Sequence, residues 1–247
     1  MILAAAQTQP IAGDIRANVD EHCRLIRIAV EHDADLIMFP EMSMSGYGHE
    51  QASTWAFTPM DSRLQAMQEL SAKHNIIVIA GAPIRMDAGL YIGSFILHPD
   101  GSQSIYTKQF LHSHENRFFE ASFSYNPVIS LGQEQLSLAI CADIDQPQHV
   151  ENAHRAGSSL YIPSIFFTAE EMSEAYTTLK HASAKYSLNI LISNYSGNVW
   201  GQQAGGKSAF WNQNGELVAH LGESDTGLLL INNTMKSWMA NTIIDNN

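Results

Sequence analysis

The sequence predicts an α/β fold in which apolar strands alternate with amphipathic helices. Short runs that are apolar throughout, such as those before Pro40 and Cys141, are typical of strands covered on both faces. Between such runs lie segments whose apolar residues recur at helical spacing. The chain has 247 residues, 45% of them hydrophobic, which suffices for one sizeable core. No low-complexity linker divides residues 1–247, so we expect a single domain.

In the first half of the chain, strands and helices follow one another in turn. A first helix presents one apolar face, and an Asp-Gly pair between apolar runs indicates a hairpin. The expected elements are a strand over 2–7, a helix with Ile15, Val19, Ile26 and Val30 on one face, a strand over 34–40, a helix over 62–74, a strand over 75–84, a hairpin turned at Asp100 and Gly101, and a strand ending at Cys141.

The second half repeats this pattern, which places helices outside and sheets inside. Its expected elements are a helix over 147–156, a strand over 159–166, a helix over 170–186, a strand over 189–195, a hairpin turned at Asn214 and Gly215, and a strand over 226–231. The polar tail from 232 onward shows no clear packing face.

Charge and cysteine content exclude several classes of protein. The formal charge is -12, from 25 acidic and 13 basic residues, and no basic run is present that could follow phosphates, so nucleic acid and anionic membrane surfaces are not expected partners. The only cysteines, Cys23 and Cys141, form neither a disulfide framework nor a zinc ligand set. No secretory leader or membrane-spanning run of about 18 apolar residues is found. We therefore expect a cytoplasmic protein with reduced thiols.

Three reactive side chains stand at the ends of predicted strands. Glu41 follows one apolar run, Lys108 closes the hairpin, and Cys141 closes a further run. A carboxylate base, an ammonium and a thiol are the groups needed to attack an unactivated carbonyl carbon. Taken singly, Glu41 is more typical of a solvated loop carboxylate and Lys108 of an exposed lysine. Cys141 alone is more typical of a small buried residue.

Ordered motifs around these residues resemble the nitrilase superfamily of carbon-nitrogen hydrolases. The motifs are "FPEMSMSGY" at 39–47, "YTKQFLH" at 106–112 and "LAICADIDQP" at 138–147, with further likeness in the opening segment and in "GGKSAFWNQNGELVA". The resemblance covers almost the whole chain. It implies a four-layer α-β-β-α sandwich and chemistry without a metal or organic cofactor.

The resemblance also assigns roles to individual residues. It implies Glu41 as general base, Lys108 as cationic stabiliser and Cys141 as nucleophile. A second glutamate that orients the lysine and substrate corresponds to Glu115, with Glu120 as the less favoured choice.

The sequence points less specifically to substrate contacts than to Glu41, Lys108 and Cys141. They are Tyr47, Phe166, Asn194 and the backbone N–H of Ala142, whereas His112 is interpreted as packing. Asp143 is expected either to brace the turn after the nucleophile or to place charge at a helix start. The loop departs from the usual family pattern, because Ala142 replaces an aromatic residue and Asp145 a basic one.

The expected activity is hydrolysis of a small amide or N-carbamoyl compound through a cysteine thioester. The alternatives are nitrile hydrolysis and a non-catalytic binding protein on the same scaffold. An acyl group that carries a carboxylate would need a cation, for which Arg117 is the nearest candidate.

The remaining expectations concern metals and subunits. A metal site in "HSHE", with His112, His114 and Glu115, is not expected because no further Cys or His completes the ligand set. The resemblance implies a homodimer or larger homo-oligomer formed through the helices over 147–156 and 170–186.

Overall fold

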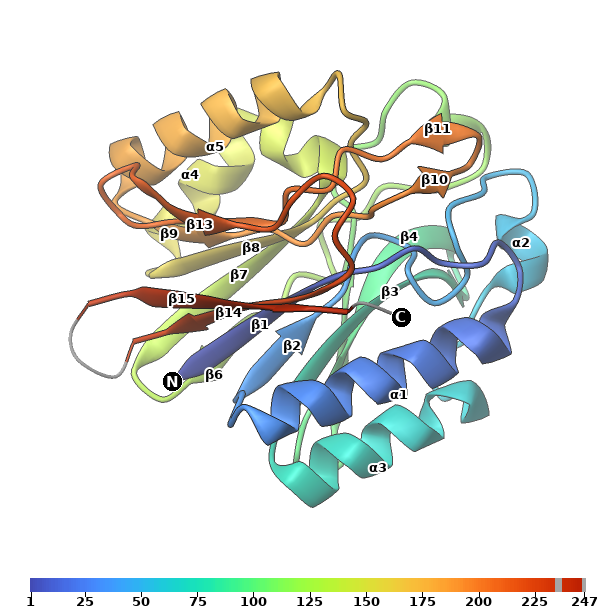
Figure 1. Ribbon diagram of the computed structural model, residues 1–247. Helices are drawn as coiled ribbons and strands as arrows, with labels where there is room; N and C mark the ends of the chain where they lie inside the picture. The colour runs from blue at the N-terminus through green and yellow to red at the C-terminus, as the bar shows by residue number, and fades with distance from the viewer. Residues whose placement is uncertain (234–236, 246–247) are drawn as a thin grey trace.

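Two β-sheets face each other, and helices cover their outer faces (Figure 1). The computed structural model describes residues 1–233 and 237–245. Helices α1 (Ile15–Glu31) and α3 (Gln65–His74) cover one sheet, and α4 (Pro147–Arg155) and α5 (Met172–Tyr186) cover the other. The predicted α/β class and α-β-β-α layering are confirmed.

The first sheet has seven strands in the order β15-β14-β1-β2-β3-β4-β5. Strand β2 runs parallel to both β1 and β3, and the other neighbours are antiparallel. The strands are β1 (Ile2–Gln7), β2 (Leu36–Met38), β3 (Ile77–Met86), β4 (Gly89–Leu97), β5 (Gln103–Thr107), β14 (Gly227–Asn232) and β15 (Met239–Ile244).

The second sheet has six strands in the order β13-β12-β9-β8-β7-β6, with β7, β8 and β9 mutually parallel. Its strands are β6 (Val128–Leu131), β7 (Glu134–Ile140), β8 (Leu160–Ser164), β9 (Asn189–Leu191), β12 (Ala209–Trp211) and β13 (Leu217–His220). Smaller elements are α2 (Ala52–Trp55), the 3-10 turns η1 (Ser62–Leu64), η2 (Glu115–Arg117) and η3 (Cys141–Asp145), and a two-stranded hairpin of β10 (Asn198–Val199) and β11 (Gln202–Gln203).

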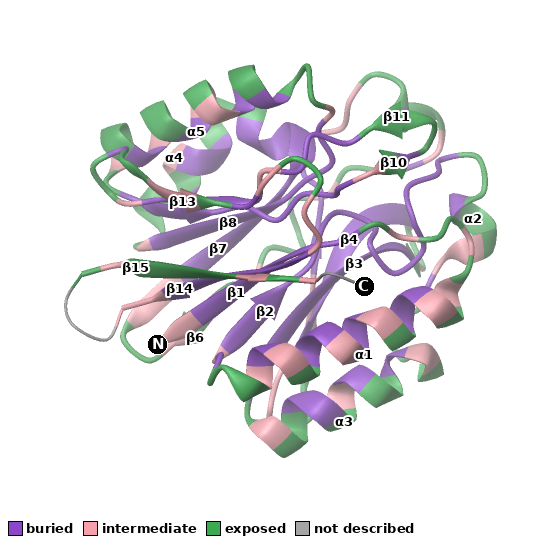
Figure 2. Cartoon of the chain, viewed as in Figure 1, coloured by how far each residue is buried: buried purple, intermediate pink, exposed green. Residues whose placement is uncertain are grey.

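The period-two alternation of strand side chains divides the core into two layers. On β1, Leu3 and Ala5 point between the sheets, whereas Ala4 and Ala6 pack with residues of α1 and α3. Both sets are fully buried, so this strand is apolar on each face (Figure 2). This explains why the strands read as continuous apolar runs rather than as alternating ones.

The tail of the chain differs from the expectation drawn from its sequence. Residues 239–244 form β15, which pairs antiparallel with β14 at the edge of the first sheet. Most of β15 is exposed, so its backbone hydrogen bonds, rather than an apolar face, hold it in place. Residues 234–236 and 246–247 of this tail lie outside the described residues. Within residues 1–233 and 237–245, no helix has the length and apolar character to cross a bilayer.

Candidate active site

The three reactive side chains converge between the two sheets. Glu41 follows β2 and Lys108 follows β5 of the first sheet, while Cys141 follows β7 of the second. Glu41 and Lys108 are 0% exposed and Cys141 is 2% exposed. Glu41 contacts both Lys108 and the Cys141 thiol, so the structure brings together three residues that are far apart in the sequence.

Lys108 lies between two carboxylates. Its Nζ donates to Glu41 Oε1 at 2.9 Å and to Glu115 Oε1 at 2.7 Å. The other oxygen of Glu115 accepts the backbone N–H of His112 at 2.8 Å. Glu120, the less favoured choice, is exposed. Glu115 thus fixes both the lysine side chain and the loop that follows it.

Burial and pairing set the protonation of this group. Burial raises the pKa of Glu41 to about 7, although Lys108 acts in the opposite direction. For Lys108, burial alone would lower the pKa, but Glu41, Cys141 and Glu115 outweigh it and raise the pKa above its usual value. For Glu115, burial is outweighed by Lys108, and the pKa lies below its usual value. Near neutral pH, Glu41 is the carboxylate poised to exchange a proton.

Cys141 is the first residue of η3, directly after β7, and its backbone is constrained. Its φ is 45°, in the left-handed region that side chains other than glycine rarely adopt. Burial, reinforced by Glu41, raises the pKa of the thiol well above its ordinary value. The sulfur lies 3.6 Å from Nε2 of His112 and 3.5 Å from the carbonyl oxygen of Phe166. The thiol therefore needs a base to become a nucleophile.

Asp143 holds the lysine segment against the cysteine turn. Its Oδ2 accepts the Tyr106 hydroxyl at 2.6 Å and the Ile140 N–H at 2.9 Å. Its Oδ1 accepts the backbone N–H groups of Gln109 at 3.0 Å and Phe110 at 2.9 Å. Asp143 is 0% exposed, so it braces the turn rather than merely adding charge to a helix start.

Close backbone packing places Glu41. A Cβ on Gly81 of β3 would lie 2.5 Å from both the carbonyl oxygen of Pro40 and the backbone N of Met42. Only glycine lets the turn that carries Glu41 approach β3 this closely. The Tyr195 hydroxyl donates to the backbone carbonyl of Glu41 from the opposite side.

The predicted substrate contacts take different positions. The Tyr47 hydroxyl donates to Glu115 Oε1 at 3.3 Å, and its ring packs on Phe166 at 4.6 Å between centroids. Ala142 is buried directly after Cys141. Asn194 instead accepts the Phe167 N–H through Oδ1 and donates through Nδ2 to the carbonyls of Phe167 and Gly206. These bonds make Asn194 a brace for the segment after β8, and its contact with substrate remains a prediction.

Sequence reasoning missed part of the site. His112, interpreted as packing, lies beside the sulfur. His49 is 1% exposed and neither of its ring nitrogens has a hydrogen-bond partner among the described residues. Burial lowers the pKa of His49 to about 4, which keeps the ring neutral. His49 lies two residues beyond the end of the motif "FPEMSMSGY", and its sequence context gave no sign that it would be buried near Tyr47.

The donor atoms of His49, His114 and Glu115 lie within 4.8 Å of one another, as in a set of metal ligands. The set expected from "HSHE" was His112, His114 and Glu115. In the structure His49 takes the place of His112 in this cluster. The Glu115 carboxylate is already engaged by Lys108 and by the backbone, however, so a cation would have to compete with a buried ion pair. The cluster is therefore a poor metal site as long as Lys108 holds Glu115.

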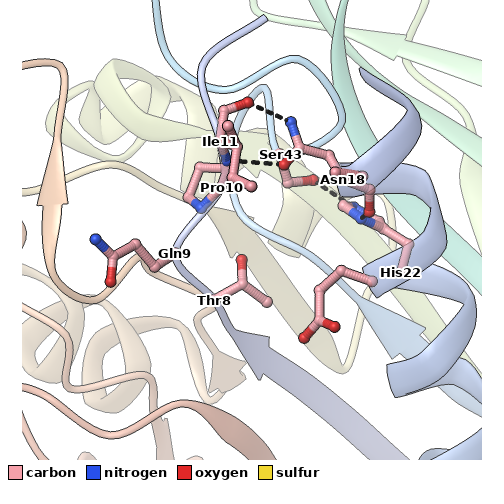
Figure 3. Close-up of a pocket in the computed structure, with 9 residues that line it drawn as sticks. Thr8, Gln9, Pro10, Ile11, Asn18, His22 and Ser43 are labelled. Atoms are coloured by element: carbon pink, nitrogen blue, oxygen red, sulfur yellow. Dashed lines mark hydrogen bonds between the residues drawn. The ribbon is translucent and has the colours of Figure 1, made fainter. Parts of the chain in front are cut away.

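A cavity of about 280 Å³ lies apart from this cluster, beside the end of β1 and the start of α1 (Figure 3). Its lining residues are Thr8, Gln9, Pro10, Ile11, Ala17, Asn18, Glu21, His22 and Ser43. Within it, His22 Nε2 lies 2.9 Å from the Ser43 hydroxyl, and burial lowers the pKa of His22 to about 4. This neutral contact ties α1 to the loop that follows Glu41.

Comparison with known proteins identifies the family. The sequence profile described as "Carbon-nitrogen hydrolase" matches residues 2–239. The chain belongs to the carbon-nitrogen hydrolase family. The chain also falls within the nitrilase superfamily, as its motifs predicted.

Curated relatives of this carbon-nitrogen hydrolase carry varied names. A "Hydrolase in pqqF 5'region" of Pseudomonas protegens is 25% identical over 90% of this chain and 79% of that protein. An arylacetonitrilase of Aspergillus niger is 30% identical over 49% of this chain and 41% of that protein. The chain therefore spans about two fifths of the length of that nitrilase.

Solved structures share the fold of this carbon-nitrogen hydrolase. The amidase from Nesterenkonia sp. AN1 superimposes with a TM-score of 0.85 and 22% identity, over 94% of this chain and 92% of that one. Variants of that amidase have been solved with butyramide and with acrylamide.

Proposed function

We propose that this carbon-nitrogen hydrolase is an amidase that cleaves a small amide or N-carbamoyl compound through a thioester on Cys141. The observation that carries the proposal is a buried lysine that bonds two glutamates beside a buried thiol. Because both sheets contribute to this cluster, we propose that residues 1–247 act as one catalytic domain. No metal or organic cofactor is needed for the steps below.

In the first step, the Cys141 sulfur bonds to the amide carbon while Glu41 takes the thiol proton. A carboxylate with a pKa of about 7 is well matched to this transfer at neutral pH. The carbonyl π electrons move to oxygen, and Lys108 together with the Ala142 N–H stabilises the oxyanion. Glu115 keeps Lys108 oriented and charged.

In the second step, the tetrahedral intermediate collapses. The carbon–nitrogen bond breaks, and Glu41 returns its proton to the departing ammonia or amine. Water then attacks the thioester carbon while Glu41 accepts a proton from it. Collapse of this second intermediate releases the carboxylic acid, and the proton returns to the sulfur.

The choice of an amide over a nitrile is supported by the solved neighbour, whose variants hold butyramide and acrylamide. The fungal relatives named arylacetonitrilase favour the alternative of nitrile hydrolysis. Ammonia release from matched panels of amides, N-carbamoyl compounds and nitriles tests this choice. We expect turnover of short amides that survives exhaustive chelation and is lost on thiol alkylation. Failure to turn over any panel member would favour a binding protein.

The pH dependence should report the ionisation of Glu41. We expect kcat/KM to fall about tenfold per pH unit below pH 7 and to level off above it, because Glu41 must be ionised to accept the proton. Burial lowers the pKa of His112 from its usual value, so His112 does not account for this limb. An exposed-carboxylate control, Glu120→Gln, should retain the profile. A midpoint near that of an ordinary glutamate would contradict the assignment.

We also propose that the protein is a cytoplasmic homodimer or larger homo-oligomer with no nucleic acid or membrane partner. The outward faces of α4 and α5 are available for such pairing, since most of their unburied residues are exposed. Sedimentation at micromolar concentration should give a mass above that of one 27.3 kDa chain. A monomer would contradict the assembly.

A further inference from the structure

The candidate nucleophile is closed off from solvent. Cys141 is 2% exposed, and its partners Glu41 and Lys108 are 0% exposed. A reacting carbon has to approach the sulfur to about 3–3.5 Å before a bond can form. Some group that covers the thiol must therefore move during the reaction.

The covering groups form a continuous chain of rings that begins and ends at Cys141. We call this chain the aromatic collar. Consecutive ring centroids lie 4.6 to 5.6 Å apart. At its two ends, an imidazole nitrogen lies 3.6 Å and a backbone carbonyl oxygen 3.5 Å from the sulfur. The collar consists, in order, of His112, His114, His49, Tyr47 and Phe166.

Trp200 lies across three members of this collar. Its ring centroid is 4.8 Å from that of His49, 5.5 Å from Tyr47 and 6.4 Å from His114. The indole is 39% exposed, so it meets solvent on one side and covers the buried rings of Tyr47 and His49 on the other, whereas His114 is itself exposed. Rings at these separations are in ordinary packing contact.

The element that carries Trp200 is a small hairpin, held by the buried Val199 and by pairing with Thr168 and Ala169. Trp200 and Gly201 form the turn of the β10–β11 hairpin, in which only two residues of each strand pair. A hairpin of this size is marginal by itself and opens at low cost compared with the sheets. Movement of the turn at Trp200 and Gly201 would uncover the collar while the buried Val199 stays in the core.

The collar is suited to one kind of acyl group. It contains no carboxylate, ammonium or guanidinium group, and Arg117, the candidate cation of the sequence, is exposed. Burial of a charged acyl group here would carry a large desolvation cost. The two ring nitrogens of His49 are buried without a hydrogen-bond partner among the described residues, and an unsatisfied buried donor or acceptor is unfavourable, so a polar atom of a ligand would be well placed to pair with them.

The geometry points to a gated acyl pocket: the turn of the β10–β11 hairpin opens to admit substrate and closes Trp200 onto the collar, which selects small uncharged acyl groups. This inference rests on the proposed amidase function. It assigns Trp200 to the control of entry and of size, and it places the acyl group against Tyr47, His49 and Phe166. Removal of the indole should therefore relax the size limit.

Alkylation of Cys141 tests the gate without relying on hydrolysis. Wild-type protein should react with iodoacetamide much faster than with N-benzyl iodoacetamide. Trp200→Ala should raise the rate with the bulky reagent by about tenfold or more, with a smaller gain for iodoacetamide, and Trp200→Leu should lie between. Mass spectrometry of peptides separates Cys141 from Cys23. The control Trp238→Ala removes an indole that packs on Phe210 instead, and should change neither rate.

Amide turnover then tests the selectivity. Wild-type enzyme should prefer propionamide to both phenylacetamide and succinamate, and Trp200→Ala should improve kcat/KM for phenylacetamide alone. Unchanged rates with the bulky alkylating reagent in both Trp200 variants would overturn the gate, and so would equal gains in Trp238→Ala. Faster alkylation of Trp200→Ala in a protein that hydrolyses no amide would uphold the gate and refute the proposed amidase function.

Discussion

Replacement of Cys141 by alanine should reduce amide hydrolysis by about 10⁴-fold or more, because no other group can form the thioester. The fold should persist, since the side chain is small and the turn is held by the carboxylate of Asp143. Steady-state ammonia release gives the loss of activity, and thermal unfolding gives the stability. Intact mass after brief exposure to substrate should show an acyl adduct on wild-type protein and none on the variant.

The second thiol provides a matched control. Cys23 is buried on α1, where it belongs to the core between that helix and the first sheet. Cys23→Ala should therefore retain catalysis while losing some stability through its small cavity. Equal loss of activity in the two variants would show that Cys141 acts only as a core residue. Retained activity in Cys141→Ala would remove the basis of the proposed mechanism.

Motif residues could be predicted because their positions follow from strand ends. Glu41 and Cys141 follow apolar runs and Lys108 closes a hairpin, so each stands at a strand end, where loop side chains gather. Periodicity predicts the strands and helices but not how they are arranged in layers. The α-β-β-α arrangement came from the family resemblance. Asp143 was left with two readings, and the four hydrogen bonds to its carboxylate decide between them.

The aromatic collar and Trp200, which cover Cys141, could not be predicted from strand ends. His49 and Trp200 come from separate loops, and loop side chains meet through tertiary packing that leaves no periodic trace in the sequence. His112 was interpreted as packing because an isolated histidine gives no sign of a neighbouring sulfur. Strand β15 was missed because its exposed residues do not alternate, and it is held by backbone pairing with β14.

Lys108→Met should lower kcat by about 10²–10³-fold and also destabilise the fold. The loss in kcat is that expected when the ammonium, a single oxyanion stabiliser, is removed. It also leaves Glu41 and Glu115 buried without their shared cation, and removal of one partner of a buried ion pair costs about 3–5 kcal/mol. Denaturant unfolding at pH 7 measures this loss.

The pH dependence of that loss distinguishes an electrostatic cause from poor packing. Without Lys108, the pKa values of Glu41 and Glu115 in the folded protein rise above those of the unfolded chain, so the folded state binds more protons. The stability deficit should therefore grow as pH rises from about 5 to 8 and shrink on acidification. The double variant Lys108→Met/Glu115→Gln removes one of the two carboxylates and should recover part of the stability but none of the activity. A deficit that is independent of pH and unchanged in the double variant would mean that Lys108 contributes through packing alone.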